Sequence, residues 1–75
     1  MDSRIGSFWK VGTLGYYIKV LRESDHSQSF YVVENIVGNR DILPKLQLLQ
    51  DSYVECSEDD FKKARIKWTL WKLKS

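Results

Sequence analysis

Residues 29–37, SFYVVENIV, constrain the fold more than any other stretch of this sequence. β-branched and aromatic side chains fill the run, which predicts a strand. Apolar side chains fall on both faces of such a strand: Phe30, Val32 and Ile36 on one face, and Tyr31, Val33 and Val37 on the other. A strand that is apolar on both faces is usually central in a sheet or part of a small barrel. The chain is therefore predicted to build a sheet around this run.

Three further segments are predicted to be strands that pair with this one. Residues 8–11 and the β-branched, aromatic run 16–22 precede it, and residues 52–56, SYVEC, follow it. The polar residues 23–28 are typical of a longer hairpin loop. Residues 38–39, Gly-Asn, are predicted to form a two-residue turn, because both residue types accept the positive φ angles of a tight hairpin.

Residues 41–50, DILPKLQLLQ, allow two interpretations. Leu46 and Leu48 alternate with polar residues as in a strand, whereas Pro44 suits the first position of a short helix. We favour a strand that follows Pro44, since a proline inside the paired part would cost a ladder hydrogen bond. Residues 44–50 thus stay open between strand and helix.

A helix is predicted to begin in the acidic stretch that follows these strands. Ser57 can cap its first turn, and Asp60 stands at the capping-box distance from it. The carboxylates of Glu58, Asp59 and Asp60 also favour the positive end of a helix dipole. A short helix is therefore expected near residues 58–65.

Residues 66–74 again allow two interpretations. As a strand, Ile66, Trp68 and Leu70 alternate with polar residues, and the alternation slips by one residue after Leu70, as a β-bulge would produce. As a continuation of the helix, the stretch has apolar residues on opposite faces and no clean polar face. Such a helix needs both faces covered, for instance in a dimer. We favour the short helix followed by a bulged last strand.

These elements predict one small domain over residues 1–75 that is mainly β (α+β). A small antiparallel barrel or curled sheet, of SH3-like or Tudor-like layout, suits five or six short strands and one short helix. A chain of 75 residues buries only about 60–65% of its unfolded surface, so its core is thin. The core is expected to form on the two strongest strands, from Ile18, Val20, Phe30, Val32 and Ile36.

The net charge of +2 hides a division along the chain. Residues 1–60 carry six basic and ten acidic residues, a net charge of −4, whereas residues 61–75 carry six basic residues and no acidic one. This uneven distribution of charge suggests that the basic end of the chain contacts an acidic surface or group.

The sequence has no catalytic or metal-binding signature. His26 lies in a polar stretch between Asp25 and Ser27, but neighbours in sequence cannot adopt the geometry of a catalytic triad. The acids of residues 58–60 are best explained as helix caps. Cys56 is the only cysteine, which favours a reduced thiol and a cytoplasmic protein. We therefore expect no enzyme activity, no catalytic residue, no cofactor, no bound metal and no small-molecule substrate.

We expect instead a binding module, a small adaptor or inhibitor that acts on another protein, for which a second copy of the chain is one candidate. The size of the chain and its start at Met1 suggest a viral accessory protein. The expected partner-binding residues lie in the basic, aromatic end: Lys62, Lys63, Arg65, Lys67, Trp71, Lys72 and Lys74.

The alternative is a small nucleic-acid-binding β-barrel. Its lysines would contact phosphates while Trp71 stacked on a base. Nucleic-acid domains tend to be more basic than this chain, and the acidic body would repel phosphate, so protein binding is favoured. The longest apolar runs are a few residues, and the amino-terminal stretch lacks the apolar segment of a signal peptide. We therefore expect no membrane partner.

Overall fold

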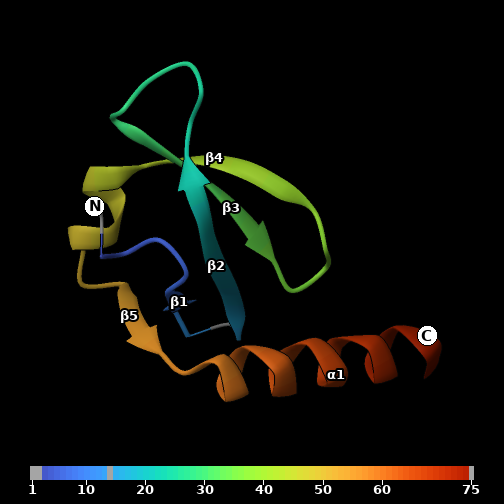
Figure 1. The fold of residues 1–75 in the computed structure, drawn as a ribbon. Coiled ribbons are helices and arrows are strands. Elements are labelled where there is room, and N and C mark those ends of the chain that lie inside the picture. The colour runs from blue at the N-terminus through green and yellow to red at the C-terminus, as the bar shows by residue number, and fades with distance from the viewer. Residues whose placement is uncertain (1–2, 14, 75) are drawn as a thin grey trace.

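The computed structural model describes residues 3–13 and 15–74, and it contains an antiparallel sheet, a 3-10 helix and one α-helix (Figure 1). The elements follow one another as β1 (Phe8–Val11), β2 (Tyr16–Glu23), β3 (Phe30–Asn35), β4 (Arg40–Pro44), η1 (Lys45–Leu49), β5 (Tyr53–Cys56) and α1 (Glu58–Lys74). The strands predicted over residues 8–11, 16–22 and 52–56 are therefore confirmed, and the strand predicted over residues 29–37 is confirmed for residues 30–35.

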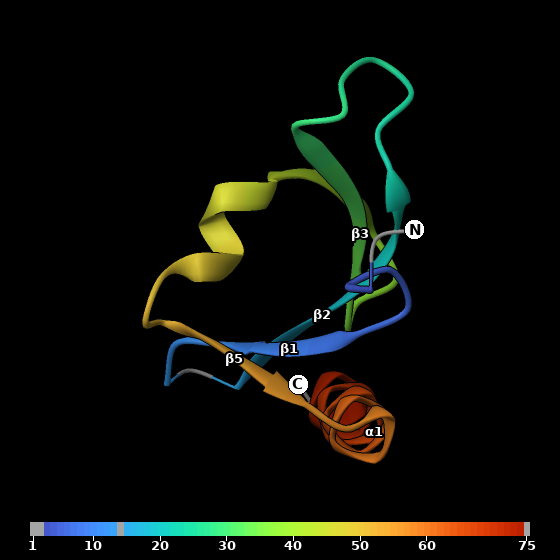
Figure 2. The ribbon, with the colours of Figure 1, turned by 60° about the vertical axis from the view of Figure 1, so that its left-hand side comes forward.

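The five strands form one sheet in the order β4-β3-β2-β1-β5, and each pairs antiparallel with its neighbours. Consecutive strands pair along most of the sheet, and β5 returns beside β1. Among the described residues, β4 and β5 remain the two edges, so the sheet curls without closing (Figure 2). The predicted curled antiparallel sheet of a mainly β (α+β) fold is thus confirmed, and β3 is an interior strand as expected.

The core lies on one face of the sheet. Val20 and Tyr31 are fully buried there, and Leu48 of η1 packs against the same cluster. Of the residues predicted to form the core, four are buried and one is half-buried: Ile18, Val20, Val32 and Ile36 are buried, and Phe30 is half-buried.

The strand predicted after Pro44 is wrong, because residues 45–49 form η1 instead. Pro44 ends β4 with an extended backbone, where the missing N–H breaks no ladder inside the strand. A strand would point Leu46 and Leu48 to the same face. The tighter helix instead buries Leu48 and leaves Leu46 exposed.

The two-residue turn predicted at residues 38–39 is also wrong. The connection between β3 and β4 has four residues, 36–39. The Asn35 side-chain Oδ1 organises it by accepting hydrogen bonds from the backbone N–H of Val37 at 3.0 Å and of Asn39 at 3.1 Å. Gly38 alone supplies the positive φ, at 96°, so the described turn does not use Asn39 in that conformation.

The helix begins as predicted but continues past residue 65 to Lys74, so the bulged strand over residues 66–74 is wrong. The capping box is formed: the Ser57 hydroxyl accepts from the Asp60 N–H at 3.1 Å, and the Asp60 carboxylate accepts from the Ser57 N–H at 3.3 Å. Neither glycine nor proline follows to end the helix. Acidic residues in the first turn of the helix, and Lys72 and Lys74 in its last turn, interact favourably with the helix dipole.

α1 lies across the face of the sheet opposite the core, beside β1 and β2 (Figure 2). Its first half contacts the sheet, and its second half extends past the strands (Figure 1). The molecule is accordingly elongated, with principal extents of 40, 24 and 17 Å.

Candidate functional site

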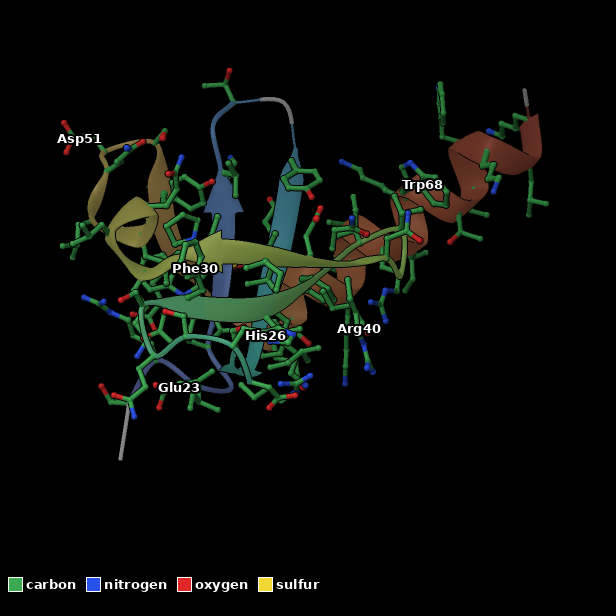
Figure 3. The ribbon with its side chains drawn as sticks, turned by 90° about the horizontal axis from the view of Figure 1, so that it is seen from above. Glu23, His26, Phe30, Arg40, Asp51 and Trp68 are labelled. Atoms are coloured by element: carbon green, nitrogen blue, oxygen red, sulfur yellow. The ribbon has the colours of Figure 1, made fainter. Side chains whose placement is uncertain are left out.

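The second half of α1 exposes an unusual amount of apolar surface. All residues of α1 are described, and of these only Phe61 is buried. Among the others, Ile66 is 59% exposed, Leu70 55%, Trp71 66% and Leu73 78%. Figure 3 shows this projecting half of α1, residues 66–74, extending away from the strands, with Trp68 near its base. Large exposed apolar patches are typical of interaction sites, so this half of α1 is a candidate interaction surface.

The projection arises because α1 is attached to the sheet only through its first half. The ring of Phe61 lies against that of Phe8, with centroids 5.2 Å apart. The Arg65 guanidinium donates to the Glu34 carboxylate at 2.8 Å and to the Asn35 carbonyl at 3.4 Å, and it lies 4.8 Å from the Phe61 ring centre. Beyond Arg65 the described helix residues are half-buried or exposed.

The apolar residues of α1 occupy two opposite sides of the helix. Phe61, Ala64 and Trp68 face the sheet, as their spacing of three and four residues requires. Ile66, Leu70 and Leu73 share the other side, about 180° around the helix axis, and we call them the outer stripe. Because apolar residues lie on both sides of the helix, packing one side against the sheet leaves the other side exposed to solvent.

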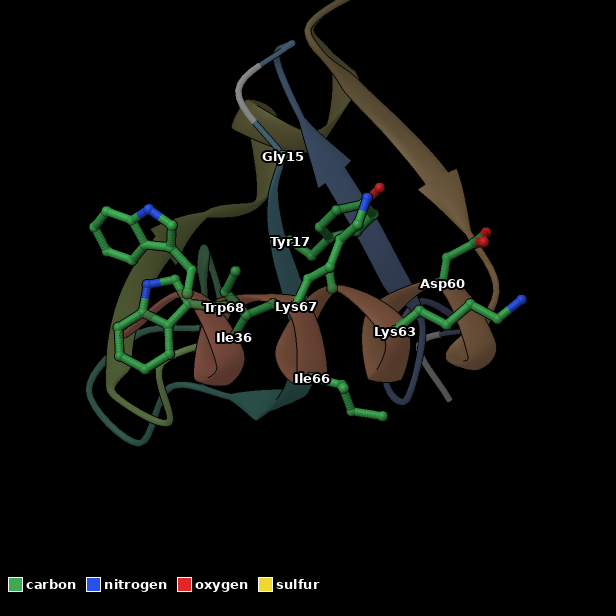
Figure 4. Close-up of a pocket in the computed structure, with 10 residues that line it drawn as sticks. Gly15, Tyr17, Ile36, Asp60, Lys63, Ile66, Lys67 and Trp68 are labelled. Carbon is green, nitrogen blue, oxygen red and sulfur yellow. The ribbon is translucent and has the colours of Figure 1, made fainter. Parts of the chain in front are cut away.

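A groove of about 850 Å³ opens between α1 and the sheet (Figure 4). We call it the tryptophan groove. Its lining comes from the residue before β2, from β2, from the residue after β3 and from α1: Gly15, Tyr17, Ile36, Asp60, Lys63, Ala64, Ile66, Lys67, Trp68 and Trp71. Ile66 thus belongs both to this lining and to the outer stripe. In Figure 4 the Trp68 ring lies beside Ile36, and Lys67 extends towards Tyr17. The groove thus joins an apolar, aromatic lining to a lysine.

Charged side chains are unevenly placed around the groove. Lys63 and Lys67 both line it, and neither forms an ion pair with any described residue. Asp60 lies at the end nearer the start of α1, where its carboxylate caps the helix. The Lys72 ammonium lies 5.0 Å from the Trp68 ring centre and adds positive charge beside the groove.

Of the seven residues predicted to bind a partner, the structure brings Lys63, Lys67 and Trp71 together in the groove. Lys72 and Lys74 lie in the last turn of α1 and are exposed. Lys62 is exposed and 3.7 Å from the Glu58 carboxylate. Arg65 differs from the other predicted partner-binding residues, because its side chain contacts Glu34 and Phe61 and holds α1 against the sheet.

Several groove residues were not predicted as part of a site, among them Tyr17, Ile36 and Trp68. Tyr17 alternates with the buried Ile18 and so lies on the opposite face of its strand, which is the face that α1 covers. Ile36 was expected in the core, and Trp68 was expected on a bulged last strand. Nothing in the local sequence places these three beside one another, because their meeting depends on where α1 crosses the sheet.

A second, smaller hollow of about 350 Å³ lies between β3, β4 and the loop after β2. Its charges are mixed: Arg22 pairs with Asp25 at 3.1 Å, while Arg40 and Asp41 line the other side. His26 also lies there, exposed. Within the described part of the chain, no cluster of histidine, cysteine and acidic side chains is placed to hold a metal ion.

The Cys56 thiol is half-buried at the end of β5. Its pKa is raised above the ordinary value, first by partial burial and then by the nearby carboxylates of Asp60 and Glu55, whereas Lys10 opposes the rise. A raised pKa keeps the sulfur protonated and weakly nucleophilic near neutral pH.

Among the residues described, none of the helices is both long and apolar enough to cross a membrane. No family of known proteins matches the chain, and no curated protein or solved structure matches it significantly either.

Proposed function

We propose that the protein is a non-enzymatic binding module, a small adaptor or inhibitor that acts by contacting another protein through the projecting half of α1. The observation that carries this proposal is the exposure of Leu70, Trp71 and Leu73 on a helix whose contact with the sheet ends near Trp68. Burying apolar surface contributes roughly 25 cal/mol per Å². A partner that covered both sides of this half would gain the stabilisation that the sheet leaves unused.

The residue types support a protein partner. Tryptophan is enriched among the residues that dominate binding energy in protein interfaces. Trp71 is exposed on α1, where the backbone is already helical, so less conformational entropy is lost on binding than for a disordered segment. The lone Cys56 supports action in a reducing, cytoplasmic compartment.

A second copy of the chain is the less favourable partner for this surface. Two projecting halves would bring together Lys67, Lys72 and Lys74 of each copy, and residues 61–74 contain no acidic residue to offset them. Like charges held together in an interface disfavour association. We therefore place a different, more acidic protein ahead of a homodimer.

Nucleic acid is the alternative partner, and one observation favours it: an exposed Trp71 stands among lysines that can reach phosphates. Against it stand the outer stripe, which offers apolar surface that a phosphate backbone cannot use, and the acids in the first turn of α1. Protein binding therefore remains the better explanation.

The test is a selection from a phage-displayed library of random 16-residue peptides. The targets are the wild-type protein and a variant with Leu70→Ser, Trp71→Ser and Leu73→Ser. We expect peptides that bind the wild type and not the variant, while a single-stranded oligo(dT) probe binds weakly at moderate salt. Selection of no such peptide, together with tight oligo(dT) binding that falls steeply with salt, would favour the nucleic-acid alternative.

A further inference from the structure

We propose that the tryptophan groove is the docking site for a short acidic segment of another protein. Apolar side chains of that segment enter between Tyr17, Trp68 and Trp71, and one of its carboxylates pairs with Lys67. This inference rests on the proposed function and specifies which side of α1 the partner occupies and the chemistry of the segment that fits.

The size of the groove limits the occupant to a few residues. Its volume of about 850 Å³ accommodates several side chains and falls in the usual range for binding pockets. Asp60 and Trp71 lie at its two ends along α1, and eleven residues of helix span about 17 Å. An extended peptide covers that distance with about five residues. The occupant is therefore a short linear segment.

The apolar residues that line the groove indicate that the bound segment also carries apolar side chains. Tyr17, Trp68 and Trp71 present aromatic surface, and Ile36 adds an aliphatic contact from the sheet side (Figure 4). Trp68 is half-buried and held near Lys72, whereas Trp71 is mostly exposed. The groove thus has one fixed aromatic wall and one that a ligand can cover.

The charged residues of the groove favour an acidic bound segment and set the direction in which it lies. Lys63 and Lys67 face the groove without an ion-pair partner among the described residues. Asp60 lies beyond Lys63 and would repel a carboxylate at that end. A bound carboxylate is therefore best placed at Lys67, with the apolar side chains extending from there towards Trp71.

The same charges exclude the equivalent segment of a second copy. The projecting half of α1 in another molecule has apolar side chains of suitable size, but its bases are Lys67, Lys72 and Lys74 and it has no acid. An occupant of complementary charge is therefore not the projecting half of another copy, and we assign it to a different protein.

The experiment uses the peptides selected on the wild-type protein from the random 16-residue library. Their sequences are expected to be enriched in Asp or Glu close to aromatic or aliphatic residues. The most enriched peptide is then synthesised without tryptophan, together with a twin in which Asp and Glu are replaced by Asn and Gln. Binding is followed by the fluorescence of the protein's own tryptophans.

Two matched pairs of variants locate the binding site. Trp71→Ala and Lys67→Glu alter the groove, and each is expected to weaken peptide binding by about tenfold or more. Leu46→Ala on η1 and Arg22→Glu on β2 make comparable changes at exposed positions away from α1 and outside the groove lining, and each is expected to change peptide binding by less than about threefold. Circular dichroism establishes that all four variants are folded.

Three results would overturn the inference. If Leu73→Ala and Lys74→Glu, two further variants at the exposed end of α1, abolish binding while the groove variants do not, the outer stripe is the site, and the proposed function survives without the groove. If the neutral twin binds as tightly as the acidic peptide, the groove does not select for acidic segments. If no peptide is selected and only oligo(dT) binds, the inference fails together with the proposed function.

Discussion

The Arg65 guanidinium lies 2.8 Å from the Glu34 carboxylate, and this ion pair joins the middle of α1 to β3. Glu34 is mostly buried and also lies 3.9 Å from the Arg40 side chain, so its carboxylate is held on two sides. The contact fixes the point at which α1 leaves the sheet. Everything beyond it, including Trp71, is positioned by this attachment.

We expect Arg65→Met and Glu34→Gln each to lower the free energy of unfolding by about 1–2 kcal/mol, because each leaves a partly buried polar group without its partner. A double-mutant cycle measured by urea denaturation should give a coupling energy of about 0.5–1 kcal/mol. Purely additive effects would show that the two side chains do not stabilise each other.

The capping box predicts a second effect on the helix. Ser57→Ala removes the side-chain acceptor of the Asp60 N–H and is expected to cost about 1 kcal/mol. Ser52→Ala, at an exposed position in the turn before β5, is the matched control and should change stability by less than about 0.5 kcal/mol. Equal losses in thermal denaturation would contradict a special role for Ser57.

The core prediction compares two valines. Val20 is fully buried in the middle of β2, whereas Val54 on β5 is 59% exposed. Val20→Ala should therefore cost about 1–3 kcal/mol, a large fraction of the stability of so small a domain, and Val54→Ala much less. Chemical denaturation measures the free energy of unfolding of both variants. A larger loss for Val54→Ala than for Val20→Ala would contradict the prediction.

The raised pKa of Cys56 predicts slow alkylation. At pH 8 less of the thiol is ionised than in an unfolded chain, so iodoacetamide should react faster after urea denaturation. Asp60→Asn removes a nearby negative charge, which lowers the pKa of Cys56 and should speed alkylation. Ser57→Ala weakens the same cap without changing charge and serves as the control. A slower reaction in Asp60→Asn would contradict the proposed electrostatic cause.

The charge of the projecting half predicts weak self-association. Light scattering at low salt should give the monomer mass of 8.9 kDa. Added salt screens the repulsion between lysines and should promote whatever apolar contact the outer stripe makes. A dimer that is present at low salt and dissociates as salt rises would instead indicate attraction between the acidic body and the basic helix.

The sequence predicted the sheet better than the helix. The runs at residues 16–22 and 29–37 carry strong strand propensity, and the Ser57–Asp60 capping box is a local pattern, so each could be recognised without tertiary information. Residues 66–74 could not be assigned from local sequence in this way, because Trp68 and Leu70 suit a strand and a helix equally. The helix continues because nothing in its sequence stops it, even where the sheet no longer supports it.

The candidate site was predicted only in part for the same reason. Lys67 and Trp71 stand out by composition, and the structure places both at the groove. Tyr17 and Ile36 come from segments far along the chain, and only the crossing of α1 over β2 brings them beside the tryptophans. Side chains that meet through tertiary packing leave no periodic signal in a single sequence.

The strand order has a consequence for how the chain folds. The pairings of β1 with β2, β2 with β3 and β3 with β4 join segments close in sequence, whereas β5 must find β1, with Phe8 opposite Cys56. Closing that long loop costs more entropy, so we expect the three hairpins to form early and β5 to add late. Substitutions at Tyr53 should then speed unfolding while leaving the folding rate unchanged. Because α1 follows β5 directly, the tryptophan groove is completed only in this last step of folding.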